Sequence, residues 1–319
     1  MAITHNQGLT SLNALESLNF VGFLRIGTNR QLATLDGLSG IQLEPDTPSR
    51  LAIARNPSLE SIASLAGLQG ELSQLRIYDN PNLNSLAGLQ GLTRIGELRL
   101  EDNGPSADLE PLSELNAVDW LTLGGMPALT NLDQMAGIGG PLFELRLRDN
   151  PNLLNINQLA ALENGRINRL TLIRNDRLIH IDGLKGKLAS DMAFSIQIQQ
   201  NAALRQVDGL KGAGMEYVKD GVTVTDNPSL RNLDGLSDLS RIEGFIQPGV
   251  ILSGDLTISG NAALNDCAAL GKVLGFPARP HNEDTDNVPR FLTIASNGEG
   301  AQNPDDCLDA YAERVDENK

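Results

Sequence analysis

The stretch Leu145-Arg-Leu-Arg-Asp-Asn150-Pro-Asn-Leu153-Leu-Asn-Ile156-Asn-Gln-Leu-Ala-Ala-Leu162 contains the unit from which the whole chain is built. Its first leucines alternate with arginines, which is the period-2 pattern of a strand with one buried face. An asparagine follows the strand, and leucine and isoleucine then recur at short intervals. We therefore expect a coil made of a short strand, a tight corner and an apolar return segment.

The same asparagine returns about once every two dozen residues along the 319 residues of the chain, and Met126 replaces it in one coil. A repeat of this period predicts a mainly β parallel solenoid of about twelve coils with short helical turns. We expect a single solenoid over residues 1–307 and a polar tail or linker at 308–319. The recurring asparagines are Asn6, Asn29, Asn56, Asn80, Asn103, Asn150, Asn175, Asn201, Asn227, Asn261 and Asn297.

Each corner carries residues suited to a turn. An inward asparagine can donate and accept hydrogen bonds, so a stacked ladder of asparagines would satisfy backbone amides that the turn otherwise buries unpaired. Proline often follows, as at Pro57 and Pro151, and fixes the backbone angle of the turn. The return segment often contains Asp-Gly-Leu, as at residues 36–38. The glycine there indicates either a positive φ or close approach of a neighbouring coil.

Charge and hydropathy restrict the partners. With 25 basic and 40 acidic residues the chain has a formal net charge of -15, which repels phosphate backbones and anionic membrane surfaces. We therefore expect no nucleic-acid partner. No run approaches the roughly 18 to 20 apolar residues of a membrane span, so no membrane insertion is expected. Because Met1 and Ile3 already occupy strand positions, the chain resembles a segment of a longer protein, and an export signal or anchor can lie outside it.

The two cysteines lie just beyond the asparagines of the last two coils. Cys267 follows Asn261 and Cys307 follows Asn297, which predicts a disulfide that links the final coil to the coil before it. Closing a loop of about 40 residues contributes about 3 to 4 kcal/mol in the chain-entropy model. The alternative is a pair of buried free thiols in a reduced protein. A bridge indicates an extracellular or cell-surface location.

The stretches Arg241-Ile-Glu-Gly244 and Gly254-Asp-Leu-Thr-Ile-Ser-Gly-Asn261-Ala-Ala-Leu264-Asn-Asp-Cys267 resemble the repeats of the receptor L-domain family, relatives of leucine-rich repeats. The resemblance implies a right-handed solenoid with a parallel sheet on one broad face, used to bind a ligand. Similar repeats occur in receptor ectodomains and in bacterial surface and secreted proteins. The chain has only two cysteines and no Asn-x-Ser/Thr sequon, so the bacterial type is the better match. No ligand-contact motif of the family maps onto specific residues.

Outward positions in the first half of the chain are rich in charge and are the first candidate ligand surface. Ion pairing on a solvated sheet is the simpler explanation, and recognition of a charged protein or glycan is the alternative. Trp120, just before residues 121–123, is either an exposed anchor of the type enriched in binding hot spots or a partly buried edge residue, and the edge residue is the favoured interpretation. The candidate surface comprises Arg76, Tyr78, Arg99, Glu101, Trp120, Arg146, Arg148 and Arg174, with Arg25, Arg55, Asp79, Asp102 and Asp149 nearby.

Outward positions in the second half form an uncharged stripe. Threonine at regular spacing can bind ice or a crystalline polysaccharide, but threonine is also a good strand residue, and Gln197 and Gln199 interrupt the stripe. Ice or crystal binding is therefore a minor alternative. The stripe comprises Thr171, Thr223, Thr225, Thr257 and Thr293.

The chain offers little for catalysis. Glu101 and Asp102 beside Asp79 come closest to an acid–base cluster, but the neighbouring arginines would keep them ionised, so a polysaccharide-active enzyme is a minor alternative. The three histidines lie in different coils and the cysteines lack zinc spacing, so we expect neither a metal site nor a cofactor. Solvated charge explains the terminal acidic cluster better than a calcium loop does. That cluster comprises Glu283, Asp284, Asp286, Asp305 and Asp306.

These observations predict a noncatalytic extracytoplasmic recognition or adhesion module that binds a protein or a glycan through the face of its parallel strands. The alternative is a structural segment that stacks end to end on another copy or on a larger surface protein. The chain would then be a monomer in the first case and an end-to-end assembly in the second.

Overall fold

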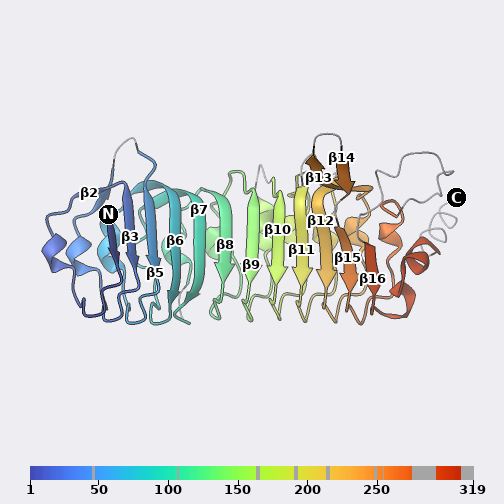
Figure 1. Ribbon diagram of the computed structural model, residues 1–319, viewed down its shortest axis with the longest axis horizontal. Helices are drawn as coiled ribbons and strands as arrows, with labels where there is room; N and C mark the ends of the chain where they lie inside the picture. The colour runs from blue at the N-terminus through green and yellow to red at the C-terminus, as the bar shows by residue number, and fades with distance from the viewer. Residues whose placement is uncertain are drawn as a thin grey trace. The chain divides into compact units, whose positions relative to one another are not determined.

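The computed structural model describes residues 1–44, 47–105, 108–162, 166–189, 193–212, 216–247, 250–253, 255–274 and 292–309. The chain divides into two compact units, Met1–Asn150 with Ala161–Asn164, and Pro151–Ala160 with Gly165–Lys319. Both units consist of coils that each contribute one strand to a parallel sheet, which confirms the mainly β parallel solenoid (Figure 1). The single solenoid over 1–307 stays a prediction, and residues 310–319 of the expected tail lie outside the described residues.

In the first unit, successive strands of the main sheet pair in parallel and in chain order. A short parallel pair, β2 (Phe20–Val21) and β4 (Gln42–Leu43), lies beside them. The main strands are β1 (Ala2–Thr4), β3 (Phe23–Gly27), β5 (Arg50–Ala54), β6 (Gly70–Asn80), β7 (Leu92–Asn103), β8 (Ala117–Gly124) and β9 (Glu144–Arg148).

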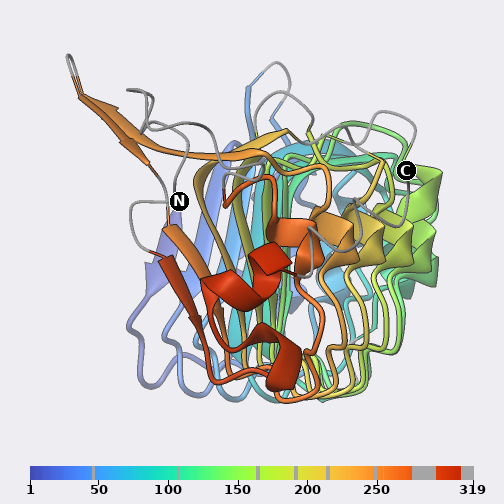
Figure 2. The same ribbon diagram turned by 90° about the vertical axis from the view of Figure 1, so that its right-hand side faces the viewer.

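In the second unit, β10 (Arg169–Ile173), β11 (Ala193–Gln199) and β12 (Tyr217–Thr225) pair in the same way. The start of β12 pairs with β13 (Arg241–Gln247), and its end pairs with β15 (Asp255–Ser259). β13 turns back into the antiparallel β14 (Val250–Ser253), a hairpin that leaves the body of the coils in Figure 2. β15 then pairs with β16 (Leu292–Ala295).

The returning side of most coils is a short 3-10 helix, which confirms the expectation of single turns, while the coil between β6 and β7 returns through turns alone (Figure 2). Residues 304–309 are α-helical. Within the described residues, the 3-10 helices are η1 (Asn13–Leu15), η2 (Asp36–Leu38), η3 (Ala63–Gly67), η4 (Glu110–Leu112), η5 (Asp133–Met135), η6 (Asn157–Ala161), η7 (Asp182–Leu184), η8 (Asp208–Leu210), η9 (Asp234–Leu236), η10 (Ala268–Leu270) and η12 (Glu299–Ala301).

The inward strand positions form the core with the leucines and isoleucines of the return segments, nearly all without solvent exposure. The asparagines form the expected ladder at one corner. The Oδ1 atom of Asn80 accepts hydrogen bonds from the backbone N and the Nδ2 atom of Asn56, at 3.1 and 3.2 Å. Its Nδ2 atom donates to the Ile53 carbonyl of the preceding coil at 3.1 Å. At the substituted coil, Met126 is buried and its backbone N donates to Asn150 Oδ1 at 3.2 Å.

The residue before each ladder position adopts a left-handed backbone conformation, with φ between 51° and 68°. This conformation turns the chain from the strand into the corner, and aspartate and glycine tolerate it better than most residues. The twelve residues are His5, Thr28, Arg55, Asp79, Asp102, Gly125, Asp149, Arg174, Gln200, Asp226, Gly260 and Ser296.

The glycine of the Asp-Gly-Leu motif is required by close approach of the neighbouring coil. A Cβ atom on Gly37 would lie 1.7 Å from the carbonyl oxygen of Leu12, and one on Gly209 would lie 1.8 Å from that of Ile181. Neither glycine has a positive φ. Of the two explanations for this glycine, the structure therefore supports close approach.

Candidate binding surface on the parallel sheet

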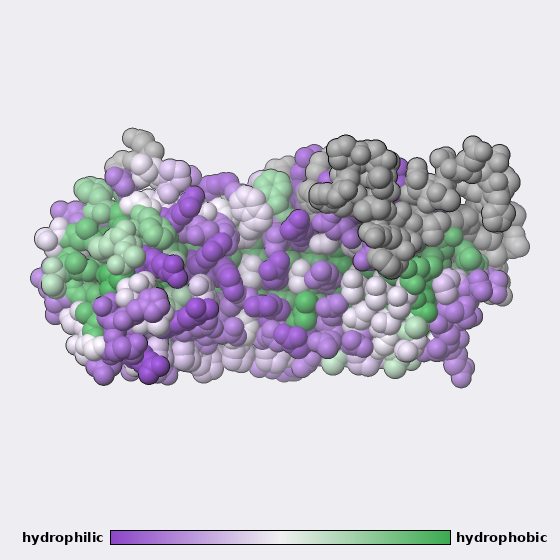
Figure 3. Space-filling model, in the orientation of Figure 1, coloured by the Kyte–Doolittle hydropathy of each residue, from purple (hydrophilic) through white to green (hydrophobic). Residues whose placement is uncertain are grey.

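The outward side chains of the first unit form three straight rows across its strands, because parallel strands in register align every second residue. The first row runs from Phe23 to Glu144, the second from Arg25 to Arg146 and the third from Gly27 to Arg148. Hydrophilic side chains predominate over β5 to β9 on this face (Figure 3). The rows are Phe23, Arg50, Gln74, Glu97, Trp120, Glu144; Arg25, Ala52, Arg76, Arg99, Thr122, Arg146; and Gly27, Ala54, Tyr78, Glu101, Gly124, Arg148.

Glu97 is held in place by its neighbours on the face. It accepts hydrogen bonds from Arg76 Nε at 2.7 Å, Arg76 Nη2 at 2.9 Å and Gln74 Nε2 at 2.7 Å. Burial alone would raise the pKa of Glu97, but these hydrogen bonds outweigh it and the pKa lies below the ordinary value. The same contact raises the pKa of Arg76. This group is therefore a fixed ion pair.

Glu101 joins two arginines from different strands. Its side chain is 3% exposed and accepts hydrogen bonds from Arg99 Nε and, at 2.7 Å, from Arg148 Nε. Arg148 belongs to β9, two strands away, so the contact crosses β8. Gly124 lies between them, and a Cβ atom there would be 3.2 Å from Cγ of both Glu101 and Arg148. The glycine thus leaves the space that this contact needs.

Two further contacts involve Tyr78 of the third row and the corner residues beside that row. The Arg99 guanidinium lies 4.8 Å from the centre of the Tyr78 ring, which is a cation–π contact. Beyond the row, Asp102 lies at a corner, with Asp79 at the preceding corner and Asp149 two corners further along the chain. Although the residue as a whole is exposed, partial burial of the Asp102 carboxyl group first, and then the charges of Asp79 and Glu101, raise its pKa above the ordinary value. The arginines thus pair with Glu101, and at Asp102 burial and the acidic neighbours outweigh the lowering effect of Arg148 on the pKa.

Trp120 is an exposed residue of the first row, so its favoured interpretation as a partly buried edge residue was wrong. It lies within β8 between Glu97 and Glu144 and is 46% exposed. Its ring centre is 6.0 Å from that of Phe143. Phe23, at the other end of the row, is also 46% exposed. Counting two residues back from Arg25 within its strand identifies Phe23 as a member of this surface. The same step from the equivalent positions of other strands identifies Arg50 and Glu97.

Other predicted surface residues lie elsewhere. Arg174 belongs to the second unit and, like Arg55, Asp79, Asp102 and Asp149, sits at a corner instead of on the strand face. Thr171, Thr223, Thr257 and Thr293 share one row with Gln197 in the second unit. Thr171 is 8% exposed and contributes little surface. Thr225 lies in the next row beside Gln199 and Ser259.

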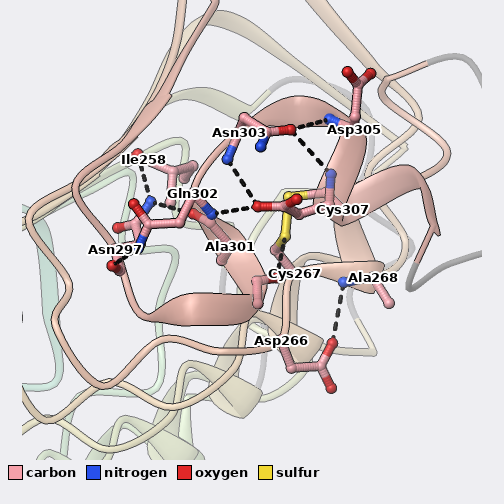
Figure 4. The surroundings of a disulfide bond; sticks show 12 residues. Ile258, Asp266, Cys267, Ala268, Asn297, Ala301, Gln302, Asn303, Asp305 and Cys307 are labelled. Atoms are coloured by element: carbon pink, nitrogen blue, oxygen red, sulfur yellow. Dashed lines mark hydrogen bonds between the residues drawn. A yellow bond between two sulfur atoms is a disulfide. The ribbon is translucent and has the colours of Figure 1, made fainter.

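The terminal coil is closed by the expected disulfide, Cys267 to Cys307 (Figure 4). Both cysteines have no solvent exposure, and their Cα atoms are 4.8 Å apart. Cys307 lies on the helix at 304–309, where Asn303 Oδ1 accepts hydrogen bonds from the backbone N atoms of Asp305 and Asp306. The Asp306 carboxylate in turn accepts one from the Asn303 backbone N at 3.2 Å. This reciprocal cap explains part of the terminal acidic cluster.

The remaining chemical predictions concern metals and membranes. Within the described residues, no group of three or more His, Cys, Asp or Glu side chains could hold a metal ion. Glu283, Asp284 and Asp286 of the acidic cluster lie outside those residues. Among the residues whose positions are described, no helix is long and apolar enough to cross a membrane.

No family model and no curated protein matches the sequence.

Proposed function

We propose that the chain is a noncatalytic recognition or adhesion module that binds a protein or a glycan through the exposed face of its parallel strands. The observation that carries the proposal is the three-row face of the first unit. Its three glutamates are held in fixed pairs with four of its arginines, and the aromatic residue Trp120 is exposed. A surface ordered before binding loses little side-chain entropy when a ligand docks. The resemblance to receptor L-domain repeats supports the same use of the face.

A noncatalytic role fits the state of the central carboxylates. Glu101 is nearly buried between two guanidinium groups, and Glu97 accepts three hydrogen bonds. General acid–base catalysis needs a carboxyl group that can reach a substrate and exchange a proton near the working pH. The disulfide supports a location outside the cytoplasm, because such bonds persist in oxidising compartments.

A blocking substitution tests this function. Thr122→Glu places a bulky charge in the middle row, between Arg99 and Arg146, without touching the core. The control Ala66→Glu adds the same charge to an exposed position on η3, away from the strands. On glycan and extracellular-protein arrays, ligands of the unmodified chain should be lost by Thr122→Glu and retained by Ala66→Glu. Equal retention by both variants would refute recognition through this face.

End-to-end stacking of copies is a second candidate, favoured by apolar exposure in the first coils. Met1, Phe20 and Phe23 are 41%, 53% and 46% exposed, and η1 has no buried residue. Apolar atoms gather around β2 and β3 in Figure 3. Sedimentation of the purified chain and of Phe20→Ser distinguishes the two candidates. A monomer at all concentrations excludes stacking, whereas assembly that Phe20→Ser abolishes supports it.

A further inference from the structure

The face of the first unit carries a charge opposite to that of the chain. Its three rows from β3 to β9 contain six arginines and three glutamates, an excess of three positive charges on a chain of net charge -15. All three glutamates accept hydrogen bonds or form ion pairs with arginines of the same face. The acidic corner residues Asp79, Asp102 and Asp149 border only the third row, the farthest from Phe23 and Trp120.

Two of these arginines are available to a ligand. Arg25 and Arg50 are exposed, lie on the adjacent strands β3 and β5, and form no ion pair within the described residues. A guanidinium presents a planar fork of donors that matches the two oxygens of a carboxylate. This pair therefore offers an anion site on the first and second rows.

The first row also offers aromatic platforms. Phe23 and Trp120 are both exposed and lie four strand positions apart, about 19 Å at the usual strand spacing. Gln74 and Glu97 lie between them in the same row. A pyranose ring presents a flat C–H face that stacks on an aromatic ring and hydroxyl groups that bond to polar side chains. A linear sugar chain lying across the strands would meet these groups in turn.

The surroundings of Trp120 favour a sugar over a protein side chain. The core of a protein–protein interface is depleted in charged residues, and its hot spots are enclosed by groups that exclude water. Trp120 instead lies between Glu97 and Glu144, each already paired with an arginine. Such fixed polar groups around one aromatic ring suit a ligand that is apolar on one face and hydroxylated at its edges.

From this arrangement we infer that the first unit binds a linear polyuronate, an unsulfated polysaccharide in which every sugar unit is a uronic acid with one carboxylate, along the row from Phe23 to Glu144. The sugar rings stack on Trp120 and Phe23, and the carboxylates pair with Arg50 and Arg25. The inference rests on the proposed function and specifies its ligand class.

Trp120 is the one tryptophan of the chain, so its fluorescence reports on this site alone. Polygalacturonate should change the emission of the full chain in a saturable way, and binding should weaken as salt screens the charges. The double variant Arg25→Gln/Arg50→Gln retains the reporter and should bind about tenfold more weakly. The matched control is Arg205→Gln/Arg231→Gln, which removes two exposed charges in the second unit and should bind like the unmodified chain.

Several probes distinguish this inference from the general function. Dextran, heparin, polyglutamate and single-stranded DNA should all bind more weakly than polygalacturonate, and equal or tighter binding of any of them overturns the polyuronate assignment. If one of these probes binds more tightly and Thr122→Glu abolishes its binding, recognition through the face is supported and only the polyuronate ligand class is refuted. If polygalacturonate leaves the Trp120 emission unchanged, or both double variants bind equally, the inference is overturned.

Discussion

Glu101 and Arg148 form an ion pair across an intervening strand, with Oε1 and Nε 2.7 Å apart over Gly124. The two residues are 47 positions apart in the sequence. The contact joins two coils of the first unit across a third, and Glu101 also pairs with Arg99 of its own strand. It is therefore a fixed part of the face and not a solvated surface ion pair.

Glu101→Gln should destabilise the first unit. The substitution removes the negative charge that two arginines share and turns an amide group toward one of them. Because Glu101 is nearly buried and the arginines are partly exposed, we expect a loss of about 1 to 3 kcal/mol in unfolding free energy. Urea denaturation measures it. Glu144→Gln, which affects a single ion pair with Arg146, is the control and should cost less. Equal losses would contradict a special role for Glu101.

Asp102→Asn should stabilise the protein at neutral pH. The folded-state pKa of Asp102 is raised, so between the unfolded and folded pKa values the folded state binds more protons, and stability falls as pH rises through this window. The substitution removes this unfavourable contribution, and asparagine suits the positive φ. Because Asp102 is exposed, we expect a fraction of a kcal/mol.

The gain from Asp102→Asn should vanish in thermal melts as the pH falls toward about 3.9, the ordinary aspartate value. Asp226→Asn is the matched control, since Asp226 occupies the same corner slot but has Gln200 and Gly260 at the neighbouring corners. The same pH-dependent gain in both variants would show that acidic neighbours are not the cause.

Asn80→Ala should be among the most damaging single changes at the ladder. It removes the acceptor of the Asn56 backbone N and Nδ2 and the donor to the Ile53 carbonyl, all of them buried. Each buried group left unpaired costs about 1 to 3 kcal/mol, so we expect a loss of about 3 kcal/mol or more. Asn82→Ala, at an exposed asparagine two residues later, should cost about 1 kcal/mol or less in the same denaturation experiment.

Gly37→Ala should also be strongly destabilising, although it adds a single carbon. The new Cβ would lie 1.7 Å from the Leu12 carbonyl oxygen, so the two coils must separate, at a cost of about 2 kcal/mol or more. Gly139→Ala is the control, because the added carbon would have no neighbouring atom within 4 Å and φ is not positive there. Calorimetry should show a lower Tm only for Gly37→Ala.

Removal of the disulfide by Cys267→Ser/Cys307→Ser should lower the unfolding free energy of the terminal coil by about 2 to 4 kcal/mol. The last coil of a solenoid has one stacking neighbour, so it should unfold before the rest. Hydrogen exchange of β16 with and without reductant measures this. Free-thiol titration of the denatured, unreduced chain should find no reactive thiol. Two reactive thiols would contradict the bridge in solution and the extracytoplasmic location.

Part of the corner geometry was open to prediction from sequence. Aspartate or glycine precedes the ladder position in six coils, at Asp79, Asp102, Gly125, Asp149, Asp226 and Gly260. Both residue types tolerate a positive φ, so this pattern is a usable signal of the corner that the repeat period alone does not carry. Asp79 and Arg174 both occupy this slot, directly before a ladder asparagine. Alignment of the coils would therefore have assigned them to the corner and not to the strand face.

The sequence by itself determined the coil, the asparagine ladder, the short helical turns and the disulfide, because each depends on spacing that repeats along the chain. Only the tertiary structure decided which charged side chains meet. Glu101 reaches Arg148 because the register aligns β7 with β9 and because Gly124 leaves a gap between them. The exposure of Trp120 likewise depends on its neighbours in other coils. Local periodicity specifies which way a residue points, whereas its partners come from strands that the chain reaches only after a full coil.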